Sequence, residues 1–315
     1  MKTKKWFAMA LACMMAVGSF AGCSSSETTS AADDGSSAAE DESSAPDSSA
    51  EETTGLTGDI HVLSREDGSG TRGAFIELLG IEEKDADGNK VDKTIASAEI
   101  TNSTAVMMQT VAGDKAAIGY ISLGSLDDSV KALKIDGVEA TTDNVKNGSY
   151  SVSRPFNIVT KEETTEVAAD FIAYILSEDG QKVVEDNGYV SEGNTGAYQP
   201  SGLTGTITVA GSSSVTPVME KLAEAYQALN SGVEIKVQQS DSTTGVTSAA
   251  DGLCDIGMAS RELKGEETAL GIHSQKIAMD GIAVIVNNEN PLEEIAAETV
   301  KGIYVGETTG WEEVK

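Results

Sequence analysis

The residues best suited to chemistry in this chain lie in one stretch, Ser64-Arg65-Glu66-Asp67-Gly68-Ser69-Gly70-Thr71-Arg72. Ser69 and Thr71 carry hydroxyl donors, and Arg65 carries a charged, planar set of N–H donors. The glycines allow the backbone to approach a guest closely. Because a strand pattern precedes the stretch and a helical pattern follows it, free backbone N–H groups and a helix dipole would point at the same spot. The stretch therefore predicts a site for a small tetrahedral oxyanion.

The same strand, Ser/Gly loop and helix pattern occurs twice more. An apolar run at 207–210 leads into Gly211-Ser212-Ser213-Ser214, and an alternating run at 233–237 leads into Ser240-Asp241-Ser242-Thr243. A single loop of this kind is often only a helix cap, but capping does not require three of them. Each loop would carry its donors to the carboxyl edge of a sheet, where open α/β folds bind ligands. We expect the three loops to meet at one site.

The elements that must position these loops alternate between strand and helix patterns. Apolar runs predict strands at 60–63, 117–121, 156–159, 255–259 and 282–286. Helical spacing predicts helices at 74–79, 166–176, 181–186 and 292–304, and a short helix that follows the loop at 240–245 and ends at about 251. In the helix that follows Pro217, Val218, Leu222 and Tyr226 share one face. A body of residues 56–315 is long for one core and favours two α/β lobes with a ligand cleft between them.

The first 55 residues are not expected to belong to the fold. A lysine-rich start and an apolar run to Phe20 are typical of an export signal at 1–22, and Phe20-Ala21-Gly22-Cys23 is typical of a lipoprotein site with the lipid on Cys23. An ordinary secretory signal is the alternative. Residues 23–55 are mainly Ser, Thr, Ala, Asp and Glu, so they predict a disordered acidic linker.

Composition and motifs exclude several classes of function. The net charge of −29 argues against nucleic acid as a partner. Cys254 stands alone in an apolar run and is expected to be a core thiol, and His61 and His273 lack the spacing of metal ligands. No cofactor, metal or catalytic motif is therefore predicted. An exported phosphate-ester hydrolase with Ser69 or Ser213 as nucleophile is the alternative; it would need a base beside the serine, and neither His61 nor His273 belongs to those loops.

Taken together, these stretches resemble the phosphate-binding proteins of Pst-type ABC importers, which are type II periplasmic binding proteins. The resemblance rests on 65–71, on 211–214 and on Asp255-Ile256-Gly257-Met258-Ala259-Ser260-Arg261, and it spans 58–315. It implies a two-lobed α/β fold with mixed sheets flanked by helices. It further implies a monomeric receptor, lipid-anchored on the extracytoplasmic face of the cell membrane, that delivers inorganic phosphate to the permease subunits. Sulfate, molybdate or tungstate is the alternative ligand.

The order of the segments differs from that family. There, the loop matched by 211–214 comes first, and the motif matched by 65–71 follows the segment that ends Gly310-Trp311. A circular permutant explains this order, and a fragment of a longer tandem protein is the alternative. The implied lobe I is 151–281, and the implied lobe II combines 56–150 with 282–315. The stretches 156–159 and 282–286 would be the crossovers between the lobes.

The resemblance also assigns the ligand contacts. The matching positions are Arg65, Ser69, Gly70, Thr71, Ser213 and Ser214, together with Ser242 or Thr243. Asp67 is expected to orient Arg65. Ser260 departs from the pattern, because some members have there an Asp that accepts the proton of hydrogen phosphate. A hydroxyl accepts that proton more weakly, so we expect phosphate to be preferred over sulfate by a smaller margin.

Overall fold

The structure is a computed structural model that describes residues 55–314, all within one compact unit. The predicted signal peptide, Cys23 and the linker up to residue 54 lie outside the described residues. No helix between residues 55 and 314 is both long and apolar enough to cross a membrane.

The chain alternates between strands and helices in the order predicted for an α/β protein. Its first part contains β1 (His61–Arg65), α1 (Gly70–Leu78), β2 (Glu82–Lys84), β3 (Lys90–Asp92), β4 (Glu99–Thr101), α2 (Thr104–Gly113), β5 (Ala117–Ser122), η1 (Leu123–Ser125), β6 (Lys131–Ala132), β7 (Lys134–Ile135) and α3 (Thr142–Lys146). The middle part contains β8 (Ser153–Lys161), α4 (Glu166–Ile175), α5 (Glu178–Asp186), β9 (Val190–Ser191), β10 (Gly205–Ser212), α6 (Thr216–Leu229), β11 (Val233–Ser240), α7 (Ser242–Asp251), β12 (Ile256–Ala259) and η2 (Glu267–Leu270). The last part contains β13 (Ile272–Val286), β14 (Glu294–Ile295), α8 (Ala297–Val305) and η3 (Trp311–Glu313).

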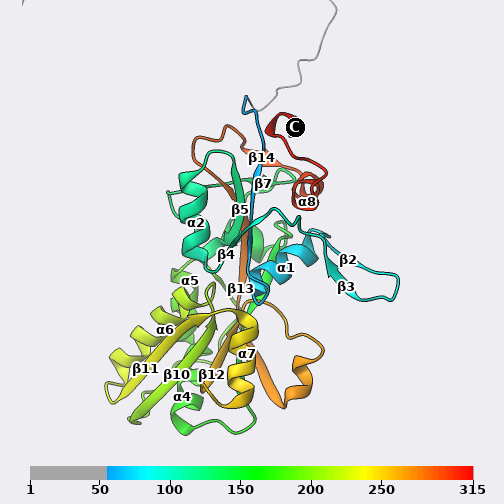
Figure 1. The fold of residues 1–315 in the computed structure, drawn as a ribbon. Coiled ribbons are helices and arrows are strands. Elements are labelled where there is room, and N and C mark those ends of the chain that lie inside the picture. The colour runs from blue at the N-terminus through cyan, green and yellow to red at the C-terminus, as the bar shows by residue number, and fades with distance from the viewer. Residues whose placement is uncertain (1–54, 315) are drawn as a thin grey trace, which may run out of the picture. The chain divides into compact units, whose positions relative to one another are not determined.

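One long strand, β13, joins the two halves of the main sheet (Figure 1). Its residues up to Gly281 pair antiparallel with β8, and the remainder pairs antiparallel with β5. The paired strands follow the order β11-β10-β12-β8-β13-β5-β1-β4. We use lobe I for 151–281 and lobe II for the remaining described residues. The chain passes from one lobe to the other within a continuous strand, at Gly281 and Ile282, and through residues 151–152 just before β8. The stretch 156–159 itself lies inside the lobe I half of the sheet, where it also pairs with β12.

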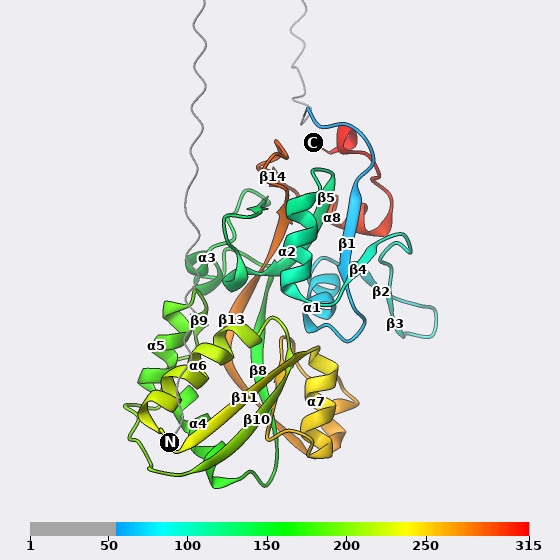
Figure 2. The ribbon, with the colours of Figure 1, turned by 60° about the vertical axis from the view of Figure 1, so that its left-hand side comes forward.

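The strands that lead to the predicted site are parallel, so their carboxyl ends share an edge. In lobe I, β10 pairs in parallel with both β11 and β12. In lobe II, β1 pairs in parallel with both β4 and β5. Helices flank both faces of each half of the sheet (Figure 2). In lobe I, α7 lies on one face of the β10–β12 strands, and α4 and α6 lie on the other. In lobe II, α2 and α8 lie on opposite faces around β1 and β5.

Two large hydrophobic clusters fill the described part of the chain. One is formed mainly in lobe II, with Val152 and Val190 as its buried members from lobe I, and it includes the stacked rings of Phe75 and Tyr120, 3.9 Å apart, and the fully buried Trp311. The other lies entirely in lobe I, and Val218, Leu222 and Tyr226 are fully buried in it, as their helical spacing predicted. Each lobe therefore has a core of its own, as the apolar periodicity of its elements required.

The sequence-based elements were wrong at one helix. Residues 292–304 were expected to be helical throughout, but α8 begins only at Ala297. Ahead of it, β14 pairs in parallel with β7, and Asp136 accepts a hydrogen bond from the N–H of Ala297. The neighbouring strand therefore takes the backbone groups of residues 294–295 that an extra helical turn would have used.

Candidate oxyanion-binding site

Four helices begin at the edge where the parallel strands end. α1 is capped by Ser69, α2 by Ser103 and α7 by Asp241, and α6 begins without a side-chain cap but with Pro217 in its first turn. The first N–H groups of a helix have no partner inside it, and the helix dipole makes this end positive. Four such ends at one edge make the region favourable for an anion even though the chain as a whole is acidic.

Arg65 is the central cation of this edge. It is the last residue of β1 and is 1% exposed. Its Nε and Nη2 atoms donate to the two carboxylate oxygens of Glu66 at 2.9 and 2.8 Å, and Nη2 also donates to Ser213 Oγ in lobe I at 2.9 Å. Its Nη1 atom is buried and has no hydrogen-bond partner among residues 55–314. A buried N–H group without a partner is costly, so Nη1 is a donor that an anion can use.

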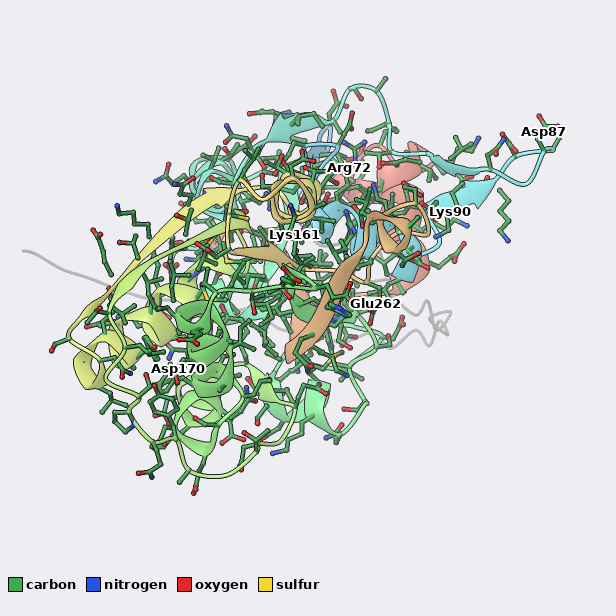
Figure 3. All side chains as sticks on the ribbon, turned by 90° about the horizontal axis from the view of Figure 1, so that it is seen from below. Arg72, Asp87, Lys90, Lys161, Asp170 and Glu262 are labelled. Carbon is green, nitrogen blue, oxygen red and sulfur yellow. The ribbon has the colours of Figure 1, made fainter. Side chains whose placement is uncertain are left out.

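Glu66 holds Arg65, and the predicted role of Asp67 was wrong. The Asp67 side chain is 98% exposed and accepts a hydrogen bond from Arg72, not from Arg65. Arg72 also donates to the carbonyl of Arg65 and to Asp92 on β3, so it ties the β2–β3 hairpin to the site loop. Figure 3 labels Arg72, with Asp87 at the tip of this hairpin. Sequence spacing alone cannot decide between two neighbouring carboxylates, because the turn after β1 sets which one faces the guanidinium.

Hydroxyl groups from both lobes meet beside Arg65. Thr71 Oγ1 in lobe II lies 2.8 Å from Ser214 Oγ in lobe I, and Thr104 Oγ1 lies 3.4 Å from the same atom. The N–H of Thr243 donates to the carbonyl of Gly68 across the same boundary at 3.2 Å. We call the predicted residues Ser69, Thr71, Ser213, Ser214, Ser242, Thr243 and Ser260, together with Thr104, the hydroxyl cluster.

The lobes approach each other closely at the predicted glycines. A Cβ atom on Gly70 would lie 2.3 Å from Ser242 Oγ and 2.6 Å from Ser260 Oγ, and one on Gly68 would lie 2.2 Å from Asp241 Oδ1. Both contacts are too short for any side chain. These positions need glycine because side chains of the opposite lobe occupy the space where a Cβ atom would lie. Neither glycine has a positive φ angle.

Ser260 belongs to a chain of hydroxyls inside lobe I. Ser212 Oγ donates to Ser260 Oγ at 2.9 Å, and Ser242 Oγ accepts from the N–H of Ser260 at 3.0 Å. Ser242 and Ser260 are both fully buried. Ser242 Oγ and Ser260 Oγ also lie 3.3 Å apart, so one of their two O–H groups bonds the other oxygen and one is left to donate. These hydroxyls therefore favour donating a hydrogen bond to a ligand at this point, which fits a site for an oxyanion.

The nearest carboxylates are already occupied. Both oxygens of Glu66 bind Arg65, and both oxygens of Asp241 bind the N–H and hydroxyl of Thr244. Glu267 binds Arg261 through two bonds of 2.7 Å, and Arg261 in turn donates to Thr243 Oγ1. Burial raises the pKa of Glu267, but the bonds from Arg261 and Lys264 outweigh it and leave that pKa below its usual value. Each of these three carboxylates is thus already held by donors of the protein.

A second buried ion pair lies where the chain crosses between lobes. Arg154 Nη2 donates to Asp280 Oδ2 at 3.1 Å, and Ser122 in lobe II donates to Asp280 Oδ1 at 2.9 Å. Burial raises the pKa of Asp280 to about 6, although the charge of Arg154 lowers it. Burial also lowers the pKa of Arg154. Sequence reasoning missed this pair because its partners are 126 positions apart.

The hydroxyl cluster is closed in this structure. A groove of about 760 Å³ runs beside it, between α1 and the 261–266 loop, which includes Glu262 (Figure 3), but none of the cluster residues lines this groove. Among the described residues no group of three or more His, Cys, Asp or Glu could hold a metal ion. Cys254 is a buried free thiol, as predicted, and burial raises its pKa to about 11.

Sequence reasoning missed one strand-to-helix junction of this edge. β4 is only three residues long and ends at Thr101, and Ser103 and Thr104 begin α2 directly after it. The signal available was a polar Thr-Asn-Ser-Thr run before a Met-rich helical pattern. A strand of three residues is too short to show an alternating pattern. Its one apolar residue, Ile100, is exposed, so it does not mark a buried face either.

Comparison with known proteins places this geometry in a family. A family model described as a PBP superfamily domain matches residues 41–179 and 196–315. A relative from Streptococcus agalactiae named "Phosphate-binding protein PstS 2" is 51% identical over 314 residues, which is 99% of each chain. A protein of the same name from Streptococcus pneumoniae is 46% identical over 82% of this chain and 89% of its own. A PstS from Bacillus subtilis is 34% identical, but over only 44% of each chain.

A solved structure is similar in fold as well as in sequence. It is described as a phosphate ABC transporter, phosphate-binding protein from Streptococcus pneumoniae, and it covers 82% of this chain and all of its own, with 46% identity and a TM-score of 0.65. The predicted two-lobed α/β architecture is therefore confirmed. The chain belongs to the PBP superfamily and, within it, to the family of the phosphate-binding PstS proteins.

Proposed function

We propose that this protein binds inorganic phosphate at the hydroxyl cluster and delivers it to an ABC importer. The observation that carries the proposal is the buried Nη1 atom of Arg65, which has no partner among residues 55–314 and lies on a guanidinium bonded to Ser213 of the opposite lobe. Hydroxyl donors and four helix N-termini surround it. Such a site offers donors from two lobes to one small oxyanion. The names of the relatives support phosphate as that anion.

The ligand contacts in this proposal are Arg65, Ser69, Gly70, Thr71, Ser213, Ser214, Ser242, Thr243 and Ser260. Glu66 replaces Asp67 as the group that orients Arg65. We also propose the lobe boundaries at 150/151 and 281/282, which the separate hydrophobic clusters support. Because the contacts come from both lobes and are buried, apart from the half-buried Thr243, the ligand enters and leaves only when the lobes separate.

The proposal includes an extracytoplasmic location, with a lipid on Cys23, and the membrane permease as the partner. The export pattern at 1–22 supports this location. The segment order supports a circular permutant: the Streptococcus agalactiae relative aligns along the whole chain, whereas the Bacillus subtilis PstS aligns along less than half.

A receptor fits the site better than a hydrolase. A serine nucleophile needs a base within hydrogen-bond reach. His61 is exposed and bonded to Asp114, and His273 is also exposed, so neither stands beside Ser69 or Ser213. Both oxygens of the neighbouring Glu66 are occupied by Arg65.

Calorimetric titration with phosphate, sulfate, molybdate and tungstate tests this function. We expect saturable, one-to-one binding with the highest affinity for phosphate. Incubation with a nitrophenyl phosphate, compared with an Arg65→Ala variant, tests the hydrolase alternative. Absence of phosphate binding, tighter binding of another oxyanion, or turnover that depends on Arg65 would each overturn the proposal.

A further inference from the structure

The junction between β4 and α2 stands beside the junction that carries Arg65. β4 pairs in parallel with β1, and Arg65 lies opposite Thr101 in their register. The N–H of Glu66 donates to the carbonyl of Thr101 at 3.1 Å, and Thr101 Oγ1 donates to the carbonyl of Ser64 at 3.2 Å. The two strands therefore end together, and the helices after them, α1 and α2, begin at the same edge.

Thr104 is the first residue of α2, but it does not cap the helix. Ser103 does so, because its Oγ accepts the N–H of Val106 at 3.2 Å. Thr104 is 6% exposed, and the contact of its hydroxyl is Ser214 Oγ in lobe I, at 3.4 Å. A buried threonine with no capping role has a hydroxyl available for the site.

Three hydroxyls in this part of the cluster have more donor protons than contacts with one another. Thr71, Thr104 and Ser214 are all buried, and both threonine hydroxyls contact Ser214 Oγ. Three hydroxyls carry three protons, but two contacts use only two of them. At least one buried O–H group is thus left without an acceptor inside the triad. Arg65 Nη1, on the guanidinium that donates to the neighbouring Ser213, is a second buried donor without a partner among residues 55–314.

We propose that Thr104 is a further oxyanion-contact residue, and that the N-terminus of α2 supports the bound anion together with those of α1, α6 and α7. This inference rests on the proposed function. An oxyanion beside the triad accepts the surplus O–H group, so all three hydroxyls then have partners. Lobe II thereby contributes two threonines to the anion, one from each of two adjacent strand ends.

Isosteric substitution of Thr104 tests the inference. Thr104→Val keeps the shape and removes the hydroxyl, and Thr104→Ser keeps the hydroxyl. The matched control is Thr110→Val on the same helix, because the Thr110 hydroxyl donates to the carbonyl of Val106 inside the helix and not to the site. Phosphate affinity of the full chain is measured by calorimetry, and the thermal unfolding midpoint without phosphate monitors the fold. Thr104→Ala serves if the valine variant does not fold.

We expect Thr104→Val to weaken phosphate binding about tenfold, the loss typical of one hydrogen bond to a charged group, with an unchanged midpoint. Thr104→Ser and Thr110→Val should bind as wild type. A loss below fivefold in Thr104→Val, or an equal loss in Thr104→Ser, overturns the inference while the proposed function stands. Failure of the wild type to bind phosphate overturns the proposed function and this inference with it.

Discussion

Replacement of Arg65 by alanine should remove most of the phosphate affinity. The change deletes Nη1, whose N–H groups have no partner among residues 55–314, and deletes the donor to Ser213. Hydrogen bonds between charged groups contribute about 1.5–3 kcal/mol each, so two bonds from Nη1 amount to about 3–6 kcal/mol. At about 1.4 kcal/mol per tenfold, phosphate should bind at least ~100-fold more weakly.

The carboxylate of Glu66 adds to this loss. Its side chain is 23% exposed, and without Arg65 it leaves a negative charge beside the incoming anion. The double variant Arg65→Ala with Glu66→Gln removes that charge and should recover part of the affinity. Arg65→Lys should lie between wild type and alanine, because lysine keeps the charge but lacks the planar fork that contacts two groups at once.

Calorimetric titration of phosphate at fixed ionic strength measures these differences. Lys182→Ala is the charge-matched control, because Lys182 is exposed and pairs only with Asp186 on its own helix. The reasoning would be refuted if Arg65→Ala bound phosphate within tenfold of wild type, or if Lys182→Ala lost as much affinity as Arg65→Ala did.

Three further predictions concern the lobe contact, selectivity and pH. Gly70→Ala should abolish phosphate binding, because its Cβ would lie 2.3 Å from Ser242 Oγ and hold the lobes apart, whereas Gly113→Ala, which has open space around it, should bind normally in the same titration. Ser260→Asp should widen the preference for phosphate over sulfate in competitive binding near neutral pH, because a carboxylate accepts the phosphate proton and repels a bare sulfate oxygen; an unchanged ratio would contradict this role of Ser260. The folded-state pKa of Asp280 is about 6, above its unfolded value near 3.9, so the folded state binds more protons between these values. Its contribution to the free energy of unfolding should therefore fall by about 3 kcal/mol as the pH rises from about 4 to about 6. Urea unfolding of wild type and Asp280→Asn across this range measures it, and a constant difference between the two would be inconsistent with the prediction.

Much of the site could be predicted because its chemistry is local in sequence. The Ser and Gly loops after 60–63, 207–210 and 233–237 were recognisable from strand, loop and helix patterns alone, and the structure brings all three together. A short helix ending at about 251 was expected after the loop at 240–245, and α7 does end at Asp251, although it begins earlier than expected, at Ser242. These features depend on backbone geometry within a few residues, which residue types largely determine.

The remaining features depend on tertiary contacts. Glu66 and Asp67 are equivalent by type, and only the turn after β1 places Glu66 against Arg65. Thr104 follows a strand of three residues, whose pairing with β1 comes from the sheet and not from its own pattern. The residues ahead of α8 form a strand because β7 is beside them. In each case the deciding partner is distant in sequence, so local propensity could not identify it.

The late position of β13 in the chain has a consequence for how the protein folds. β5 is buried along its whole length between β1 and β13, and the bond from Ser122 at its end reaches Asp280, 158 positions later. During synthesis the first strands of lobe II therefore appear long before the strand that completes their sheet, whereas lobe I finds its partners within one continuous stretch. Pairings of such long sequence separation carry a large loop-closure entropy and slow the search for the native state. Lobe I should consequently fold first, with the unpaired edge of β5 exposed to aggregation until β13 closes it.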